Sequence, residues 1–508
     1  MNHLQGITVL VLGLGTSGLA MARWCARHGA QVRVWDSRDD APQAAVLADQ
    51  LPDVTRVWGV LEASMLDGVM LVLKSPGLSP LDDKVAGLLS EAKRRRLAVQ
   101  GELELFARAL VDLKAAHAYA PTVVAVTGTN GKTTTTALTA LLIQRAGRRV
   151  VMAGNIGPSM LDTLRSVCLD QGDVAEWPQC WVLELSSFQL DAAATFEPNA
   201  AVVLNITQDH LDWHGSMQAY VAAKSHVFGP NTTMVLNRDD ALVAAMAPTT
   251  AVGRTARSRK KAQPVVRFGL GAPVAPGDFG LLVEGGMAWL VRAMDDSAGG
   301  HRHDSDVLIQ RLMPADAMRL RGRHNAANAL AALALATAIG CALGPMLHGL
   351  REYRGEPHRV ELVASVDDVE AFDDSKGTNV GATVAAIEGL GTDREPAKLI
   401  VLLGGDGKGQ DFSPLRQPLS RHARAVALIG RDAPLIVAAL QPLDVVQQIH
   451  ATLEEATRWC FAQARAGDAV LLSPACASLD MFRNYEHRAQ VFVDTVRALA
   501  TERGEVSA

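Results

Sequence analysis

Several features that would assign a function at once are scarce or missing in this 508-residue sequence. Its six cysteines are scattered and include no Cys-x-x-Cys pair, so neither a zinc site nor a disulfide framework is indicated. No stretch approaches the roughly 18 to 20 apolar residues of a transmembrane helix. Residues 1–8 lack the basic and apolar segments of a signal peptide. We therefore expect a cytoplasmic protein with no membrane insertion.

An excess of basic residues is missing as well. The chain has 49 Lys and Arg against 54 Asp and Glu, a formal charge of -5, so no overall positive field exists to attract nucleic acid, and we expect no nucleic-acid partner. Hydrophobic residues make up 48% and charged residues 20% of the chain, which is typical of globular domains with sizeable cores. At about 150 residues per domain, the length predicts three domains.

The first chemical signal is a glycine-rich turn, Gly13-Leu-Gly-Thr-Ser-Gly18, between a predicted strand (residues 9–12) and a predicted helix ending near residue 28. In such turns the first glycine permits the bend, the second lets a phosphate approach, and the third allows close packing of the helix. The helix N-terminus attracts the anion. The next strand ends in Asp36, which favours a dinucleotide as ligand; a turn without any ligand is the alternative.

A second strand-turn-helix unit carries a phosphate loop, Thr127-Gly-Thr-Asn-Gly-Lys-Thr-Thr134, between a buried strand (residues 123–126) and a helix to about residue 144. Its backbone amides would surround a triphosphate, Lys132 would neutralise the β and γ oxygens, and the Thr133 hydroxyl would reach Mg²⁺. The usual spacing places a glycine where this chain has Val126, so the loop is a shortened variant.

Two further predicted strands, residues 181–185 and 201–206, end in polar groups at the edge of the sheet where ligands bind in open α/β folds. Glu184 and His210 are therefore candidate Mg²⁺ ligands. A histidine is the less usual partner, because Mg²⁺ prefers oxygen. From spacing alone, a hydrogen-bonded loop histidine is the favoured interpretation of His210.

The remainder of the chain begins with a weakly patterned stretch, residues 249–306, for which a solvated loop or a small β excursion is a sufficient explanation. An alanine-rich helix follows, ending near Ile339. Beyond Pro357, predicted strands at 369–372, 399–403, 425–429 and 469–472 alternate with helical patterns, which predicts a third, doubly wound α/β unit.

Taken together, these segments resemble the Mur ligases, and the match runs through the whole chain in order. The motifs that carry the resemblance are Gly128-Thr-Asn-Gly-Lys-Thr133, Gly154-Asn-Ile-Gly157, Glu184-Leu-Ser-Ser-Phe-Gln189, Asp209-His-Leu-Asp212, His324-Asn-Ala-Ala-Asn328 and Pro357-His-Arg359. Three further segments, 13–18, 373–379 and 473–480, are similar to the branch of the family that adds D-glutamate. The Asp-Asn-Pro-Arg signature expected of the diaminopimelate- or lysine-adding branch is not found.

The resemblance implies an α/β fold of three domains. These are an N-terminal Rossmann-like domain for UDP (residues 1–110), a central P-loop ATPase-like domain (111–355) and a C-terminal Rossmann-like domain for D-glutamate and ATP closure (356–508). It also implies a monomeric ligase that uses ATP to join D-glutamate to UDP-N-acetylmuramoyl-L-alanine through an acyl phosphate, with ADP and phosphate as products, in peptidoglycan synthesis. The first glycine turn would then hold UDP rather than a dinucleotide.

The resemblance further implies roles for individual residues. Contacts to ATP are expected from Gly128, Thr129, Asn130, Gly131, Lys132, Thr133, Thr134, Asn328, Arg359 and Asp374. Contacts to the UDP end of the substrate are expected from Gly15, Thr16, Ser17, Asp36, Ser37, Ser75, Pro76 and Gly77. Contacts to D-glutamate are expected from Lys376, Thr378, Lys408, Ser478, Leu479 and Tyr485. The expected metal ligands are Thr133, Glu184, His210 and Lys224, and the expected catalytic residues are Lys132, Asn155, His210 and Lys224.

Lys224 shows how far the resemblance changes an interpretation. Read plainly, it is a surface lysine of an amphipathic helix. The resemblance instead implies a lysine carbamylated by carbon dioxide, whose two hard oxygens suit Mg²⁺. Two departures from the family pattern are Tyr485, where phenylalanine is frequent, and the long stretch 254–305, to which no role is assigned.

Three other functions remain open at this stage. A folylpolyglutamate synthase of the same superfamily would not need the glycine turn at Gly13. An NAD-dependent oxidoreductase would leave the phosphate loop unused. A P-loop switch would hydrolyse ATP without needing an amino acid.

Overall fold

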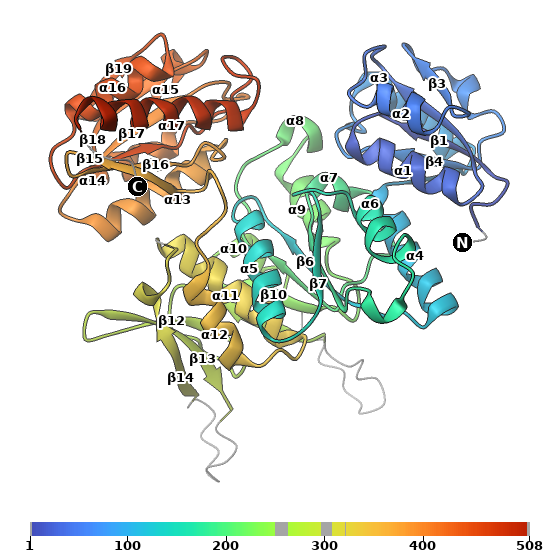
Figure 1. The fold of residues 1–508 in the computed structure, drawn as a ribbon, viewed down its shortest axis with the longest axis horizontal. Helices are drawn as coiled ribbons and strands as arrows, with labels where there is room; N and C mark the ends of the chain where they lie inside the picture. The colour runs from blue at the N-terminus through green and yellow to red at the C-terminus, as the bar shows by residue number, and fades with distance from the viewer. Residues whose placement is uncertain (1–2, 249–262, 296–306, 321, 505–508) are drawn as a thin grey trace.

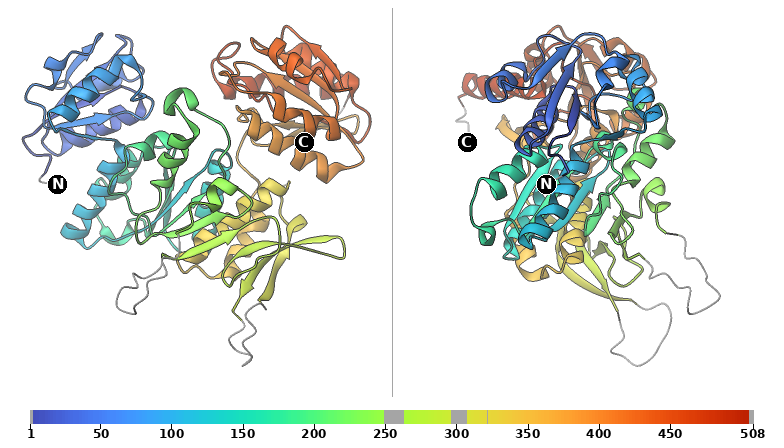
Figure 2. Two further views of the ribbon diagram at one scale, coloured as in Figure 1. Left: turned by 180° about the vertical axis from the view of Figure 1, so that it is seen from behind. Right: turned by 90° about the vertical axis from the view of Figure 1, so that its right-hand side faces the viewer.

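The computed structural model describes residues 3–248, 263–295, 307–320 and 322–504. Three α/β sheets follow one another along the chain, and the two outer ones lie at different ends of the central one (Figures 1 and 2). The α/β class and the three-domain order expected from the sequence are thus confirmed. The part of stretch 254–305 that falls in 254–262 and 296–305 lies outside the described residues.

The N-terminal sheet has five parallel strands in the order β3-β2-β1-β4-β5. Its strands are β1 (Thr8–Leu12), β2 (Gln31–Asp36), β3 (Thr55–Trp58), β4 (Leu71–Lys74) and β5 (Ala98–Gln100), with helices α1 (Thr16–Arg27), α2 (Ala44–Gln50) and α3 (Asp83–Arg94). The strand order reverses direction between β1 and β4, and the carboxyl ends on either side of such a switch point are where ligands bind. The turn 13–18 follows β1, and the turn 75–77 follows β4.

The central sheet has six parallel strands in the order β11-β10-β9-β6-β8-β7. Its strands are β6 (Thr122–Thr127), β7 (Val150–Gly154), β8 (Cys180–Glu184), β9 (Ala200–Val203), β10 (Thr233–Asn237) and β11 (Val265–Phe268). The helices of this region are α4 (Glu102–His117), α5 (Lys132–Arg145), α6 (Met160–Leu164), α7 (Ser187–Asp191), α8 (Leu211–His214), α9 (Met217–Ser225), α10 (Ala241–Ala244), α11 (Arg323–Ala338) and α12 (Leu343–Glu352). β6 is apolar throughout because both of its faces are covered: Val123 packs in one core and Val124 in the other.

A small antiparallel sheet extends from the central domain, formed by β12 (Phe279–Glu284), β13 (Met287–Met294) and β14 (Leu308–Pro314). β12 and β13 lie in the described part of the weakly patterned stretch, which also holds β11 of the central sheet, so the small β excursion expected there is present. The C-terminal sheet has the order β15-β16-β20-β17-β18-β19. Its elements are β15 (Glu361–Val366), β16 (Val369–Asp373), α13 (Val380–Arg394), β17 (Leu399–Gly404), α14 (Arg416–His422), β18 (Ala423–Ile429), α15 (Ala433–Leu440), β19 (Val446–Ile449), α16 (Leu453–Gln463), β20 (Ala469–Leu472) and α17 (Tyr485–Glu502). The edge strand β15 is antiparallel to β16, a difference from a purely parallel sheet.

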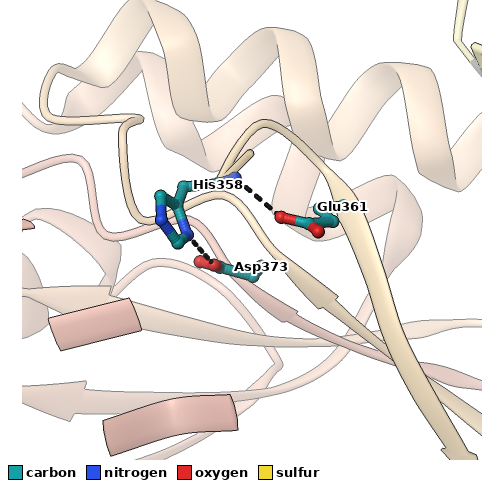
Figure 3. A group of neighbouring side chains, drawn as sticks. All are labelled: His358, Glu361 and Asp373. Carbon is teal, nitrogen blue, oxygen red and sulfur yellow. Dashed lines mark hydrogen bonds and ion pairs between the residues drawn. The ribbon is translucent and has the colours of Figure 1, made fainter. Parts of the chain in front are cut away.

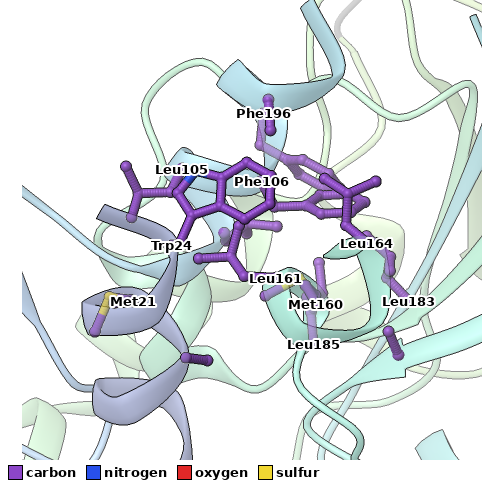
Figure 4. Close-up of a cluster of buried hydrophobic side chains, with 14 of the residues drawn as sticks. Met21, Trp24, Leu105, Phe106, Met160, Leu161, Leu164, Leu183, Leu185 and Phe196 are labelled. Atoms are coloured by element: carbon purple, nitrogen blue, oxygen red, sulfur yellow. The ribbon is translucent and has the colours of Figure 1, made fainter. Parts of the chain in front are cut away.

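One hydrophobic core joins the first two domains. Trp24 of α1 packs in a single buried cluster with Phe106 of α4, Leu161 of α6 and Leu183 of β8 (Figure 4). The two core clusters of the C-terminal domain, by contrast, contain residues of that domain alone among the described residues. The N-terminal and central domains are therefore held together by buried apolar surface, and the C-terminal domain is held mainly by polar contacts.

Replacing Trp24, which is 2% exposed, with alanine tests the shared core. We expect Trp24→Ala to lower the free energy of unfolding by about 3 to 5 kcal/mol, because it removes a buried indole and leaves a cavity. Urea unfolding followed by circular dichroism measures the change. Trp58→Ala, at a tryptophan that is 54% exposed, is the matched control and should change stability little. Equal effects of the two substitutions would contradict the shared core.

Candidate active site

The phosphate loop lies where β6 ends and α5 begins. Gly131, the N-cap residue of α5, has φ +82 and offers no side chain to cap the helix, so the first amides of α5 remain available to an anion. A Cβ atom at Gly131 would lie 2.5 Å from Asn328 Oδ1, so only glycine allows Asn328 to lie against the loop. Lys132 Nζ donates to the carbonyl oxygens of Gly128 (3.0 Å) and Thr129 (2.8 Å).

Lys224 is buried beside this loop. Its side chain is 1% exposed, and Nζ donates to Gly128 O at 2.8 Å and lies 4.6 Å from the centre of the Tyr220 ring. Burial first, and then the charge of Lys132, hold the pKa of Lys224 well below its usual range. The plain interpretation of Lys224 as a surface lysine is therefore wrong.

Glu184, at the end of β8, offers an unused oxygen. Its Oε1 accepts a hydrogen bond from Asn155 Nδ2 at 2.8 Å, whereas its buried Oε2 has no hydrogen-bond partner among the described residues. A buried carboxylate oxygen without a partner is costly unless a ligand satisfies it.

His210 lies nearby, at the start of α8. Its Nε2 is 3.5 Å from Asp209 Oδ2, and its ring centre is 4.7 Å from that of Phe188. Burial lowers the pKa of His210, which favours the neutral imidazole that can ligate a metal. Glu184, Thr133 and His210 line the same cavity, and a carboxylate, a hydroxyl and an imidazole are ligand types that a divalent cation accepts, with oxygens in the majority as Mg²⁺ prefers.

The C-terminal domain reaches this loop through two hydrogen bonds. Arg359 Nη2 donates to Thr133 Oγ1 at 2.7 Å, and Asn379 Nδ2 donates to Asn130 Oδ1 at 3.1 Å. Asp374, which is predicted to contact ATP, accepts a hydrogen bond from Ser473 Oγ at 2.6 Å. Burial raises the pKa of Asp374 to about 7.

The turn before Arg359 is held by hydrogen bonds that join His358 to Asp373 and Glu361 (Figure 3). His358 Nδ1 lies 2.6 Å from Asp373 Oδ2, and the His358 amide donates to Glu361 Oε2 at 2.9 Å. These three side chains could also surround a metal ion, since their ligand atoms lie within 4.8 Å of one another. The hydrogen bonds among these three residues explain why they lie together without a metal ion. They hold His358 at φ +63, and this turn directs Arg359 toward the phosphate loop.

A cavity of about 460 Å³ lies between the central and C-terminal domains and brings most predicted groups together. Its lining includes Thr129, Asn130, Gly131, Lys132, Thr133, Thr134, Asn155, Glu184, His210, Asn328, Arg359, Asp374, Lys376, Thr378 and Tyr485. Gly128 and Lys224 lie behind the residues that line the cavity. The Gly128 carbonyl oxygen accepts hydrogen bonds from Lys224 and from Lys132, which does line the cavity.

Some of the residues predicted to bind D-glutamate line the cavity and others do not. Lys376, Thr378 and Tyr485 line the cavity, and Lys376 Nζ donates to the Tyr485 hydroxyl at 2.9 Å. The tyrosine that departs from the family pattern thus has a partner that phenylalanine would lack. Lys408 and Leu479 are exposed and Ser478 is buried, and none of these three lines the cavity.

Several polar lining residues were not assigned roles from the sequence, among them Asn205, Asp209 and Asn325. Asn205 Oδ1 accepts a hydrogen bond from the Asn130 amide at 2.8 Å, which holds the loop open toward the cavity. The signal for Asn205 was present, since it lies in the predicted strand 201–206, near its carboxyl end.

The predicted UDP residues form a separate site at the carboxyl ends of β1, β2 and β4. Gly13 has φ +87, a backbone conformation that favours glycine, and a Cβ at Gly18 would lie 1.9 Å from Gly13 O. The backbone conformation at Gly13 and the packing at Gly18 therefore require glycine even without a ligand. A Cβ at Gly15 would meet no protein atom within 4 Å. Gly15 is therefore not required for packing, which is consistent with space reserved for a ligand.

The walls of the UDP site differ in exposure. Thr16, Ser37 and Gly77 are exposed, Ser17 and Pro76 are half-buried, and Ser75 donates from Oγ to Gly13 O at 3.0 Å. Asp36 is buried and accepts hydrogen bonds from the Leu14 amide (2.8 Å) and Arg38 Nε (2.9 Å). Burial raises the pKa of Asp36, but these hydrogen bonds outweigh it and the pKa is lowered. Arg38, which the sequence analysis missed, thus stands at the rim of this site.

Fold and site together define a three-domain α/β protein with a phosphate loop, whose polar cavity lies between the central and C-terminal domains. Models of the Mur ligase family match nearly the whole chain: the Mur ligase MurD-like N-terminal domain at residues 7–94, the Mur ligase middle domain at 126–336, and the Mur ligase glutamate ligase domain at 358–476.

Curated relatives agree with these matches. The chain is 58% identical to the UDP-N-acetylmuramoylalanine--D-glutamate ligase of Albidiferax ferrireducens, over 99% of this chain and 98% of the relative. It is 56% identical to the protein of the same name in Burkholderia pseudomallei, over 98% of each. The chain belongs to the Mur ligase family.

Solved structures share the fold. The MurF ligase of Thermotoga maritima in complex with ADP aligns with a TM-score of 0.56 at 16% identity, over 99% of this chain and 98% of that chain. UDP-N-acetylmuramate-alanine ligase MurC of Thermotoga maritima aligns with a TM-score of 0.54 at 20% identity, over 97% and 99% of the two chains. Among the described residues, no helix is both long and apolar enough to cross a membrane.

The two glycines of the first turn give a matched test. We expect Gly15→Ala to fold normally but to bind UDP about tenfold or more weakly, because its methyl group occupies only ligand space. Gly18→Ala should destabilise the N-terminal domain, because its methyl group collides with Gly13 O. Thermal unfolding and UDP titration calorimetry separate the two effects. Unchanged UDP affinity in folded Gly15→Ala would remove this turn from the UDP site.

Proposed function

We propose that this chain is an ATP-dependent ligase that joins D-glutamate to UDP-N-acetylmuramoyl-L-alanine in peptidoglycan synthesis, with ADP and phosphate as products. The observation that carries the proposal is the cavity in which a phosphate loop, an unpaired carboxylate oxygen of Glu184 and C-terminal cations converge. The names of relatives at 58% and 56% identity support the choice of substrates.

The chemistry requires activation of a carboxylate, because an amine does not displace oxygen from a free carboxylate in water. The alanyl carboxylate attacks the γ-phosphoryl group of ATP, and the bond to ADP breaks. The amine of D-glutamate then attacks the acyl phosphate through a tetrahedral intermediate, and phosphate leaves. Such phosphoryl transfer depends on alignment and charge neutralisation, which Lys132, Asn155 and the amides of the loop supply.

The metal and its ligands complete the phosphate site. Thr133, Glu184, His210 and a carbamylated Lys224 would hold Mg²⁺, which neutralises charge on the transferring phosphoryl oxygens when bound. The unpaired Glu184 oxygen and the lowered pKa of Lys224 support this assignment. A lysine with a lowered pKa exposes the neutral amine that reacts with carbon dioxide.

Substrate contacts follow from the two sides of the cavity. Gly128 to Thr134, Asn328, Arg359 and Asp374 bind ATP, and Lys376, Thr378 and Tyr485 bind D-glutamate. Lys408, Ser478 and Leu479 complete the D-glutamate pocket when the C-terminal domain closes further. The charge of Lys408 lowers the pKa of His210, which lines the cavity, and this supports the approach of Lys408 to the cavity. The first turn, Asp36, Ser37 and the 75–77 turn bind the UDP end.

The organisation and cellular setting are inferred with the same function. We place the domain boundaries near residues 110 and 355, between the sheets, and infer a monomer because one chain supplies every group named for the reaction. All six cysteines are free thiols, which fits a reducing cytoplasm.

Substrate dependence of ADP release tests the proposed function. With ATP and Mg²⁺ present, we expect ADP release only when UDP-N-acetylmuramoyl-L-alanine and D-glutamate are both added, because the amine completes the cycle. A coupled ADP assay measures the rate. Equal turnover with L-glutamate or L-lysine, or ATP hydrolysis without any amino acid, would contradict the assignment and favour another ligase or a P-loop switch.

Lys224→Ala tests the carbamate. We expect at least a hundredfold loss of kcat, on the order of 3 kcal/mol of transition-state stabilisation, because one anionic metal contact is lost. Short carboxylic acids such as acetate should restore part of the rate by occupying the vacant anionic position. Lys93→Ala, at an exposed lysine of α3, is the control and should be fully active. Full activity of Lys224→Ala, or failure of every acid to rescue it, would refute the carbamate.

A further inference from the structure

A buried lysine lies beneath the 75–77 turn that is proposed for the UDP end of the substrate. Lys74, the last residue of β4, is 5% exposed, and none of the ion pairs among the described residues includes it. Its Nζ donates to Leu78 O at 2.7 Å and lies 5.0 Å from the centre of the Trp213 ring. Burial lowers the pKa of Lys74 to about 8, against the charge of Asp191, so the group is mainly charged at neutral pH. A buried ammonium needs a compensating partner, and here an aromatic ring takes the place of a carboxylate.

Three contacts join the segment 74–81 to α8 of the central domain. The first is the Lys74 ammonium over the Trp213 ring. The second is a hydrogen bond from Ser79 Oγ to Trp213 O at 2.9 Å. The third is at Gly215, the C-cap residue of α8, where a Cβ atom would lie 3.1 Å from Leu81 Cδ1. α8 stands between the two outer domains (Figure 1), and these contacts attach it to the N-terminal one.

The same tryptophan is joined to the candidate metal ligand His210. The Trp213 amide donates to His210 O at 3.1 Å, within the single turn of α8 that His210 caps. The Phe188 ring contacts both side chains, with its centre 4.7 Å from that of His210 and 4.7 Å from that of Trp213. Trp213 is 6% exposed, and its Nε1 has no hydrogen-bond partner among the described residues. Its ring and backbone contacts therefore set its position, and Trp213 cannot shift without moving His210.

The two ends of this path are the two proposed ligand sites. A diphosphate at the 75–77 turn would fix residues 75–78, and Lys74 holds that turn through Leu78 O. Lys74 and Ser79 carry this constraint to Trp213, and the helical turn carries it to His210. A cation that binds an already ordered ligand set loses less conformational entropy, which makes the two ligands cooperative. By thermodynamic linkage, the cation then strengthens binding of the UDP end by the same factor.

We propose that Lys74 and Trp213 are positioning residues that couple the UDP turn to the divalent-cation site, so that the UDP-linked substrate and the cation each strengthen the binding of the other. This inference rests on the UDP and Mg²⁺ parts of the proposed function. Neither residue lines the cavity of the phosphate loop, so both act through His210 and not on the reacting groups. The contribution of this path to either affinity should be about five- to tenfold.

Mn²⁺ binding to the full chain, followed by electron paramagnetic resonance of the free ion, measures the coupling. Mn²⁺ serves as the probe because, like Mg²⁺, it prefers oxygen ligands. Its affinity is measured with and without saturating UDP-N-acetylmuramoyl-L-alanine, after subtraction of the Mn²⁺ that the substrate alone binds. We expect the substrate to raise the Mn²⁺ affinity of the wild type. In Lys74→Met, which keeps the apolar stem and removes the charge, this increase should be smaller by about five- to tenfold. A direct contact of substrate to metal is present in both proteins and cancels in the comparison.

Four further variants make the test specific. Trp213→Phe keeps a ring for Lys74 and removes an N–H without a partner, so it should retain most of the coupling, whereas Trp213→Leu should lose it. Ser79→Ala removes only a hydroxyl group, interrupts the second contact, and should lower the coupling at least about twofold. Lys84→Met, at an exposed lysine of α3, is the matched control and should keep the full coupling. Thermal unfolding verifies that each variant is folded.

The other outcomes separate this inference from the function on which it rests. Equal coupling in the wild type, Lys74→Met and Ser79→Ala would overturn the path and leave the proposed ligase standing. A wild type whose Mn²⁺ affinity does not respond to the substrate would overturn it as well. Absence of any substrate binding to the folded wild type, measured by titration calorimetry, would refute the UDP site itself and, with it, both proposals.

Discussion

Two lysine ammonium groups share one backbone oxygen, and the rest of the site follows from that constraint. Lys132 and Lys224 both donate to the carbonyl oxygen of Gly128, at 3.0 and 2.8 Å. Burial lowers the pKa of both lysines, and the charge of Lys132 lowers the pKa of Lys224 further. Two positive charges so close together repel each other until anions neutralise them. The triphosphate and the Lys224 carbamate that we propose would each neutralise one of these charges, and the proposed cation would satisfy the Glu184 oxygen that has no partner among the described residues.

The three domains are joined by different physical means. Apolar burial around Trp24 and Phe106 fixes the N-terminal domain to the central one, so the distance from the UDP turn to the phosphate loop is set by packing. The C-terminal domain meets the same loop through hydrogen bonds such as that of Arg359 to Thr133. Polar contacts of this kind exchange with water at little net cost, whereas opening a core does not. The first glycine turn is thus fixed relative to the phosphate loop by a shared core, whereas the C-terminal side of the cavity is held to that loop by hydrogen bonds.

The sequence predicted what local patterns determine. The strand end at Glu184, the phosphate loop and the glycine turn at residues 13–18 were readable because strand, turn and helix follow one another within a few residues. The burial of Lys224 was not readable, because it depends on a contact with Gly128 almost a hundred residues away. The burial of Glu102 was not readable for the same reason, because the amide that donates to its carboxylate belongs to Leu161 on another helix. Arg38 and Asn205 were within reach, since each stands next to an assigned motif.

Charge also makes nucleotide binding and domain closure one event. The C-terminal domain presents Arg359 and Lys376 to a cavity whose central side already carries Lys132, and the charges of both C-terminal groups act on the pKa of Lys132. Without an anion, bringing these cations together opposes closure. With a triphosphate between them, the same charges favour closure and exclude water, in which an acyl phosphate would be hydrolysed. We therefore infer that ATP acts both as reactant and as a counter-ion that strengthens the contact between the two halves of the cavity.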